Sequence, residues 1–188
     1  MNAVIESTAE EVPLKLDLGC GKAKQAGYVG VDILPFDGVD VACNLGVDVW
    51  PWANDSVSEI FSSHFLEHLD ARERVHFWNE LYRVLKKGCG GKIVTPYWAS
   101  ARAYGDPTHK WPPVGEWAYY YINKDWRLAN APHTDAANVP WGFNCDFDAV
   151  GGYGMHQSLI TRTPEYQNYA MQWFKEGAQD LHMTVTKK

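Results

Sequence analysis

The chain has 188 residues, a length typical of one compact domain, and a protein of this size buries roughly 70% of the surface that its unfolded chain exposes. The formal net charge of −6 and the pI of about 5.6 argue against a broad phosphate-binding face, because nucleic-acid-binding proteins carry clustered Lys and Arg. The four cysteines form no CxxC pair, so the sequence supports neither a zinc ribbon nor a redox motif and indicates reduced thiols in a cytoplasmic protein.

The N-terminal residues 1–13 are predicted to be a flexible leader. They are acidic and polar, without the basic start and apolar stretch of a secretory signal. The sequence contains no run of 18 consecutive apolar residues, so we expect no membrane span. Residues 14–188 are predicted to form a single domain.

The first half of this domain alternates short β-branched runs with turns, which is typical of a parallel sheet with crossover connections. The predicted strands are 14–18, 28–32, 39–42, 59–62 and 92–95. One helix is predicted between the last two strands. Asp70 and Glu73 form a capping box at its start, and the cations and glycine of Lys86-Lys87-Gly88 indicate its end.

The second half begins with a stretch over 96–144 that is rich in Pro, Gly, Trp and Tyr and has poor apolar periodicity. We predict an insertion here, with a short helix over 115–122. A strand over 155–161, a helix from Thr163 to Gly177 and a final strand over 180–186 should follow. The whole pattern predicts an α/β fold with a Rossmann-like open twisted sheet, mostly parallel, with an antiparallel C-terminal strand.

The segment LDLGCGKAKQAGYVGVDIL, residues 16–34, has the features of a nucleotide-type turn. Gly19 and Gly21 let ligand atoms approach the backbone, and Asp32 ends the second strand, where a carboxylate can accept both hydroxyls of a ribose. These features fit a nicotinamide cofactor or S-adenosylmethionine.

Three observations favour S-adenosylmethionine. Lys24 occupies the position of the third glycine in GxGxxG, and residues 22–27, before the second strand, are enough for fewer than two turns of the helix on which a pyrophosphate sits. Asp17 would repel a pyrophosphate but suits the ammonium group of a methionine moiety. An acidic chain also binds a cationic sulfonium without electrostatic penalty.

The ordered motifs LDLGCG, YVGVDI, WPWANDSVSEIFSSHFLEHL and ELYRVLKKGCGGKIVTPYW resemble the class I S-adenosylmethionine-dependent methyltransferase family, in a small branch with a truncated first helix. The resemblance covers roughly residues 14–98 and implies S-adenosyl-L-methionine as the cofactor. It places the methionine portion at Asp17, Gly19, Cys20 and Gly21, the ribose at Asp32 and Ile33, the adenine at Asn44 and Leu45, and the transferable methyl near Ser63 and His64. The abridged helix and the GCGG turn before the fifth strand depart from the family pattern.

The segment HFLEH, residues 64–68, also fits the HxxEH pattern of inverted zinc proteases. A zinc site requires both histidines on one continuous helix face and a third ligand, whereas His64 directly follows a predicted strand. We therefore predict no metal site. Glu67 and His68 are expected to tether the strand-to-helix turn by hydrogen bonds, while His64 either lines the pocket or is structural.

The insertion is expected to select the substrate, because loops beyond the carboxyl ends of strands carry specificity in open α/β sheets. Many of its aromatic rings should form a satellite core under a long loop, but as a group they can provide a stacking wall for a planar or sugar substrate. His109, in the segment GDPTHK, is the candidate general base, with Asp106 to orient it. The candidate substrate residues are Tyr97, Trp98, Tyr104 and Trp111.

The sequence thus predicts transfer of a methyl group to an oxygen or nitrogen of a small acceptor such as a sugar, a nucleotide or another metabolite. An amino-type nucleic-acid methylase is disfavoured, because those enzymes carry an Asp/Asn-Pro-Pro-aromatic motif where this chain has SHFL. A peptide or an RNA end stays open as acceptor, and so does the oligomeric state. The alternatives are a non-catalytic S-adenosylmethionine-binding partner, a degenerate methyltransferase fold, and an NAD-dependent oxidoreductase.

Overall fold

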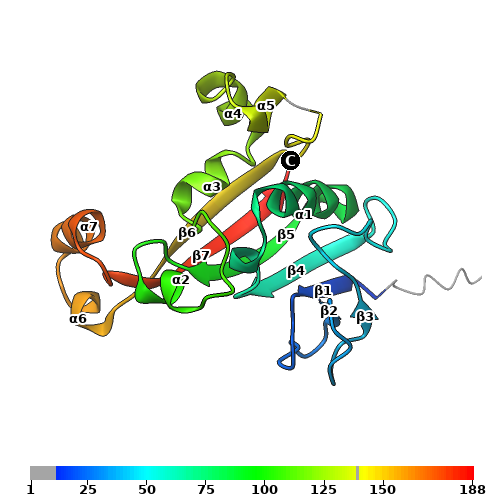
Figure 1. Ribbon diagram of the computed structural model, residues 1–188, viewed down its shortest axis with the longest axis horizontal. Helices are drawn as coiled ribbons and strands as arrows, with labels where there is room; N and C mark the ends of the chain where they lie inside the picture. The colour runs from blue at the N-terminus through cyan, green and yellow to red at the C-terminus, as the bar shows by residue number, and fades with distance from the viewer. Residues whose placement is uncertain (1–11, 139) are drawn as a thin grey trace, which may run out of the picture.

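The computed structural model describes residues 12–138 and 140–188, and a seven-stranded sheet forms its centre (Figure 1). The strands are β1 (Leu14–Leu18), β2 (Val29–Asp32), β3 (Val41–Ala42), β4 (Val57–Ser63), β5 (Leu85–Pro96), β6 (Phe147–Met155) and β7 (Ala178–Lys187). The helices are the 3-10 helix η1 (Leu66–His68), α1 (Ala71–Val84), α2 (Ala101–Gly105), α3 (Glu116–Tyr120), α4 (Lys124–Asn130), α5 (Asp135–Asn138), α6 (Gln157–Ile160) and α7 (Pro164–Trp173). The predicted leader lies outside the described residues except for its last two positions.

The strand order is β3-β2-β1-β4-β5-β7-β6, and β3, β2, β1, β4 and β5 run parallel to one another. β7 runs antiparallel to β5, and β6 runs antiparallel to β7. This arrangement confirms the predicted Rossmann-like sheet. β1 pairs with both β2 and β4, so the direction of winding reverses beside β1, and ligands of open α/β sheets bind in the crevice at such a switch point.

β1 shows why the sheet centre is stable. Leu16, Asp17 and Leu18 are all buried, as expected for a central parallel strand that is covered on both faces. The connection over 19–28 consists of turns and contains no helix. It brings the chain from the end of β1 back to β2 within a few residues.

Helix α1 begins at the predicted capping box. Asp70 Oδ1 accepts hydrogen bonds from the backbone N–H groups of Arg72 and Glu73, at 2.8 and 3.0 Å, and Glu73 Oε2 accepts one from Asp70 N at 2.7 Å. The buried apolar side chains of α1 pack in the same hydrophobic core as those of the sheet. Figure 1 shows α1 lying along β4 and β5.

The end of α1 differs from the prediction. The helix ends at Val84, and Leu85 is already extended and pairs with Val57 of β4, so the Lys86–Gly88 stretch belongs to β5. The predicted strand over 92–95 is therefore the second part of a longer strand. Pairing with β4 on one side and β7 on the other outweighs the local helix-stop signal, although Gly88 has the expected positive φ of 75°.

Two further predictions near the C-terminus were wrong in position. The strand expected over 155–161 is β6, which ends at Met155, and residues 157–160 form α6 instead. Helix α7 is capped by Thr163 and starts with Pro164 as predicted, but it ends at Trp173, before Gly177. The last strand, β7, confirms the prediction for 180–186.

The described residues of the insertion over 96–144 form the short helices α2, α3, α4 and α5, of which only α3 was predicted. Arg127 of α4 is buried, and its guanidinium donates hydrogen bonds to the backbone oxygens of Tyr121, Phe143 and Cys145. In Figure 1, α4 and α5 lie near the start of β6, whereas α6 and α7 lie at the opposite end of β6 and β7. Within the described parts of the chain, no helix has the length and apolar character needed to cross a membrane.

Candidate functional site

The glycine turn after β1 packs against the segment that follows β4. Gly19 N and Cys20 N both donate hydrogen bonds to Val31 O, at 2.8 and 3.1 Å, which fixes the turn against β2. Gly19 has a φ of +73°, and a Cβ added there would lie 2.3 Å from the Phe65 ring. The turn can therefore approach the HFLEH segment this closely only with glycine at this position.

The two acidic residues predicted at the cofactor flank this turn. Asp17 Oδ2 accepts a hydrogen bond from Gln25 N at 2.7 Å, and burial raises the pKa of this carboxyl against the effect of that bond. Asp32 lies at the end of β2, where Oδ2 accepts from Gly21 N at 2.9 Å. Each carboxylate oxygen has two lone pairs, so these bonds leave acceptor capacity for a ligand.

The other predicted cofactor residues differ in accessibility. Ile33 is exposed directly after Asp32, and Asn44 is half-buried with Oδ1 accepting a hydrogen bond from Gly46 N. Cys20 and Leu45 are buried, Leu45 within the main core, so their side chains are packing groups. These two positions can meet a cofactor through the backbone.

A matched pair of variants tests the close approach of the turn. We expect Gly19→Ala to lower the free energy of unfolding by about 3 kcal/mol or more, because the methyl group would collide with the base of the Phe65 side chain. Gly21→Ala should cost only about 1–2 kcal/mol, because φ is +52° but no atom lies within 4 Å of the added carbon. Urea denaturation of both variants measures the difference, and equal losses would contradict the packing against Phe65.

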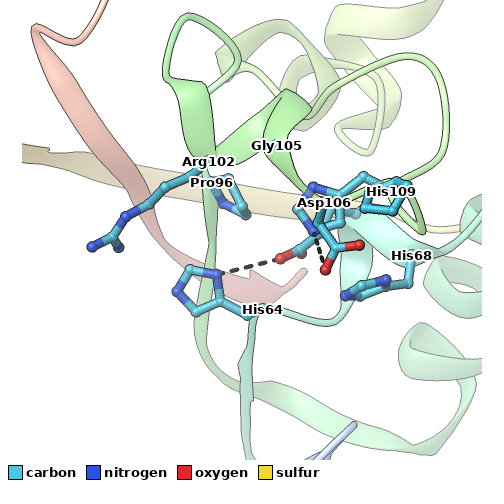
Figure 2. A pocket seen from close by; sticks show the side chains of 9 residues that line it. His64, His68, Pro96, Arg102, Gly105, Asp106 and His109 are labelled. Atoms are coloured by element: carbon cyan, nitrogen blue, oxygen red, sulfur yellow. Dashed lines mark ion pairs between the residues drawn. The ribbon is translucent and has the colours of Figure 1, made fainter.

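A polar cavity of about 610 Å³ opens beyond the ends of β4 and β5. Its lining residues are His64, Glu67, His68, Pro96, Arg102, Gly105, Asp106, Pro107 and His109. Figure 2 shows His68, Asp106 and His109 together on one side and His64 with Arg102 on the other. The predicted catalytic pair and the predicted methyl-facing His64 thus line one cavity.

His64 follows Ser63, the last residue of β4, and has a φ of 55°, which is uncommon for a non-glycine residue. Its Nδ1 lies 3.3 Å from Glu67 Oε1, and its Nε2 lies 3.8 Å from Asp180 Oδ1. The Glu67 carboxylate raises the pKa of His64, against the effect of burial. Asp180 also pairs with Arg102 at 2.8 Å, so charges of both signs line the cavity.

His109 is held by the backbone. Its Nδ1 lies 3.1 Å from Ala103 O, and since a carbonyl only accepts, Nδ1 carries the proton and Nε2 keeps its lone pair. Asp106 Oδ2 lies 3.9 Å from Nε2, beyond hydrogen-bond distance, so Ala103 rather than Asp106 orients the ring. The Asp106 carboxylate accepts hydrogen bonds from the Thr108 hydroxyl and backbone N–H, which lower its pKa.

The role predicted for Glu67 was wrong. Glu67 is 3% exposed, yet neither of its carboxylate oxygens has a hydrogen-bond partner among the described residues, so it does not tether the turn by hydrogen bonds. The His68 ring bonds to Thr108, outside the turn, whereas the His68 backbone N–H donates to Phe65 O within it. The sequence signal for both residues was the HFLEH motif. They lie near His109 because His68 contacts Thr108, forty positions further along the chain, and no local sequence pattern predicts such a contact.

The predicted substrate residues lie in two environments. Tyr97 is buried, packs edge-on against Tyr153, and has its pKa raised to about 12 by burial, as in a core residue. Trp98, Tyr104 and Trp111 are exposed and line a second, mostly apolar cavity of about 650 Å³. Three of the four rings are therefore accessible to a ligand.

Comparisons with known proteins agree with this fold. No family model and no curated protein matches the sequence. Among solved structures, the chain is similar to an S-adenosylmethionine-dependent methyltransferase from Archaeoglobus fulgidus, with a TM-score of 0.61 and 21% identity over 94% of this chain and 86% of that one. It is also similar to a chain in the complex between the Haloferax volcanii Trm112 methyltransferase activator and a candidate methyltransferase, with a TM-score of 0.55 and 12% identity over 95% and 84% of the two chains.

The strand order and these likenesses define the class of fold. The chain is an α/β protein with the Rossmann-like fold of class I S-adenosylmethionine-dependent methyltransferases.

Proposed function

We propose that this protein transfers a methyl group from S-adenosyl-L-methionine to an oxygen or nitrogen of a small acceptor, such as a sugar, a nucleotide or another metabolite. The observation that carries the proposal is the contact between the glycine turn and the segment after β4. It places a carboxylate-flanked turn next to a polar cavity, in a fold of the methyltransferase class. A cofactor in the turn would thus have its reactive end near the cavity.

The cofactor roles follow the geometry of the turn. Asp32 would accept hydrogen bonds from the ribose hydroxyls, and exposed Ile33 would cover one side of the adenosine. Asp17, buried beneath the turn, provides negative charge for the ammonium group of the methionine portion. Asn44 would border the adenine, while Ser63 and His64 would face the methyl group.

The reaction requires in-line attack on the methyl carbon. The acceptor lone pair forms the new bond to carbon as the carbon–sulfur bond breaks, and the electron pair of that bond stays on sulfur in S-adenosylhomocysteine. Holding the two reactants aligned near 3 Å can lower the barrier by about 7–11 kcal/mol. For a hydroxyl acceptor we infer that His109 promotes loss of the proton, since its Nε2 keeps a lone pair. An amine acceptor needs little such help.

The shape and charge of the cavity favour a small, polar acceptor. Its walls carry three imidazoles, two carboxylates and Arg102, which can bind hydroxyl or phosphate groups of a metabolite. The neighbouring aromatic cavity with Trp98, Tyr104 and Trp111 can accommodate a planar or sugar portion. We propose residues 96–144 as the segment that selects the acceptor within a single domain over 14–188.

Binding of the cofactor tests the proposal directly. We expect isothermal titration of the purified protein with S-adenosyl-L-methionine to show one site, and Asp32→Ala to weaken it by about 10- to 150-fold, the equivalent of about 1.5–3 kcal/mol for hydrogen bonds to a charged group. Asp37→Ala, at an exposed carboxylate in the β2–β3 connection, is the matched control and should leave the affinity unchanged.

Three outcomes would change the assignment. An unchanged dissociation constant for Asp32→Ala would remove Asp32 from the ribose site. Binding of NADH in place of S-adenosyl-L-methionine would make the protein a candidate oxidoreductase. Cofactor binding without S-adenosylhomocysteine formation across a broad panel of hydroxylated and amino acceptors would leave it a non-catalytic binding protein.

A further inference from the structure

The wall of the polar cavity joins two motifs that are far apart in the sequence. Lys110 N, in the GDPTHK segment, donates a hydrogen bond to Glu67 O in the HFLEH segment at 2.8 Å. Arg74 of α1 contacts both segments, with Nε 3.2 Å from Leu66 O and Nη2 3.5 Å from Lys110 O, and Nη1 donates to Pro112 O just beyond GDPTHK at 2.6 Å. These backbone contacts place His109 beside Glu67 and His68.

Glu67 is a buried carboxylate whose ion-pair partner is the exposed ring of His64. Glu67 is 3% exposed, it lines the cavity, and neither oxygen has a hydrogen-bond partner in the part of the chain that the structure describes. His64 Nδ1 approaches Oε1 to 3.3 Å without hydrogen-bond geometry, and the donors of Arg74 are directed to backbone oxygens. A buried carboxylate is costly unless it is paired or coordinates a metal.

Both neighbouring imidazoles have Nδ1 occupied and Nε2 left as a lone pair. For His109 the acceptor at Nδ1 is Ala103 O. For His68 the acceptor at Nδ1 is Thr108 Oγ1, 3.1 Å away. The Thr108 hydroxyl donates its own hydrogen to Asp106 Oδ1 at 2.7 Å, so its oxygen accepts from His68. Metal-binding histidines show this pattern, in which an outer hydrogen bond to the other ring nitrogen fixes the tautomer.

We propose that Glu67, His68 and His109 bind a divalent transition-metal ion at the wall of this cavity. Their ligand atoms lie within 4.8 Å of one another. Side-chain rotations that move each ligand atom by about 1 Å would bring these atoms to the roughly 3.4 Å spacing of ligands around a tetrahedral zinc ion. The ligand set differs from the HxxEH pattern, because His109 from the insertion takes the place of His64.

The donor set indicates the kind of metal. Two imidazoles and one carboxylate are the ligands of catalytic zinc sites and of non-haem iron sites, whereas magnesium and calcium prefer oxygen ligands alone. His68 and His109 lie on one side of the cavity (Figure 2), so the coordination positions that the protein does not fill would face the cavity. Asp106, with Oδ2 3.9 Å from His109 Nε2, adds a second negative charge near the cation.

The position of the site also implies a role, which rests on the proposed methyl transfer. An acceptor hydroxyl bound to the cation loses its proton to solvent more readily, because the cation stabilises the resulting oxyanion. The oxygen lone pair then attacks the methyl carbon, and the sulfur keeps the electrons of the broken bond. His109 would promote deprotonation as a ligand of the metal, and the acceptor would be one whose hydroxyl can reach the cation.

Metal binding by the full chain, stripped with a chelator, tests the proposal without any cofactor or acceptor. We expect competition with a chromophoric chelator to show one equivalent of tightly bound Zn²⁺, and Co²⁺ to give the visible absorption of a four- or five-coordinate site. Glu67→Gln, which keeps the size of the side chain, and His109→Ala should each weaken Zn²⁺ binding at least about 100-fold.

Matched histidine variants identify the ligand set. His156→Ala should leave the Zn²⁺ affinity within about threefold, since His156 lies outside the cluster. His64→Ala should weaken binding less than His109→Ala, since His64 contacts Glu67 but is not a ligand. Wild-type protein should gain thermal stability with Zn²⁺ while Glu67→Gln and His109→Ala should not, and this comparison also shows whether the variants are folded. Loss of binding in His64→Ala with retention in His109→Ala would replace our ligand set by HxxEH and overturn the proposal.

Failure of the metal site and failure of the proposed function give different results. Absence of stoichiometric Zn²⁺ and Co²⁺ binding by the wild-type protein would overturn the metal site. Titration of the same metal-free protein with S-adenosyl-L-methionine depends on the glycine turn and Asp32 and tests the cofactor site separately.

Discussion

Replacement of His109 by alanine should lower the rate of methyl transfer to a hydroxyl acceptor by roughly 10²- to 10⁴-fold, the usual contribution of a group that assists proton loss. The ring is positioned for this task by Ala103 O and presents Nε2 in the cavity beside the segment after β4. The loss should appear in kcat, because His109 lies away from the glycine turn that we propose as the cofactor site. The dissociation constant of S-adenosyl-L-methionine should not change.

The measurement is S-adenosylhomocysteine formation with the fastest acceptor from a panel of sugars, nucleotides and phenols. His133→Ala is a suitable control, because His133 is exposed and does not line the cavity. A loss smaller than about tenfold with a hydroxyl acceptor would remove His109 from the proton-transfer step. If Glu67→Gln causes a similar loss and excess Zn²⁺ partly restores both variants, the two residues act together as ligands.

Much of the fold could be predicted because its signals are local. The capping box of Asp70 and Glu73 and the buried pattern of β1 each depend on a few neighbouring residues, and the structure has both in place. The end of α1 could not be predicted in the same way. Lys86-Lys87-Gly88 carries a helix-stop signal, but the pairing of Leu85 with Val57 starts a strand before that signal is reached.

The same distinction between local and long-range signals applies to the residues of the candidate site. The glycine turn and Asp32 form one continuous sequence segment, so their neighbourhood follows from the length of the connection. The approach of His109 to Glu67 depends instead on the backbone bond from Lys110 and on the clamp of Arg74, which join distant segments. Burial of Tyr97 has a similar origin, since the ring packs against Tyr153 of β6, a strand placed there by the antiparallel end of the sheet.

The central sheet, which carries the glycine turn and the end of β4, should lose stability when a methyl group is added at Gly91. An ideal Cβ there would lie 1.7 Å from Ile60 O, a backbone atom of the neighbouring strand β4. Unlike a side chain, this carbonyl cannot rotate away without breaking the pairing of β4 with β5. We therefore expect Gly91→Ala to lower the free energy of unfolding by about 3 kcal/mol or more, at or above the upper end of overpacking effects.

Gly152→Ala provides the matched comparison, because Gly152 lies on the exposed strand β6 with no atom within 4 Å of the added carbon. It should be neutral or slightly stabilising, since alanine is favoured over glycine in a strand by roughly 0.5–1 kcal/mol. Urea unfolding followed by far-ultraviolet circular dichroism measures both variants, and equal midpoints would show that β4 and β5 are not packed as described. Because β4 ends at Ser63, a displaced Ile60 backbone would also shift the end of the strand that we propose to face the methyl group. Gly91→Ala should therefore lose cofactor affinity together with stability, while Gly152→Ala keeps both.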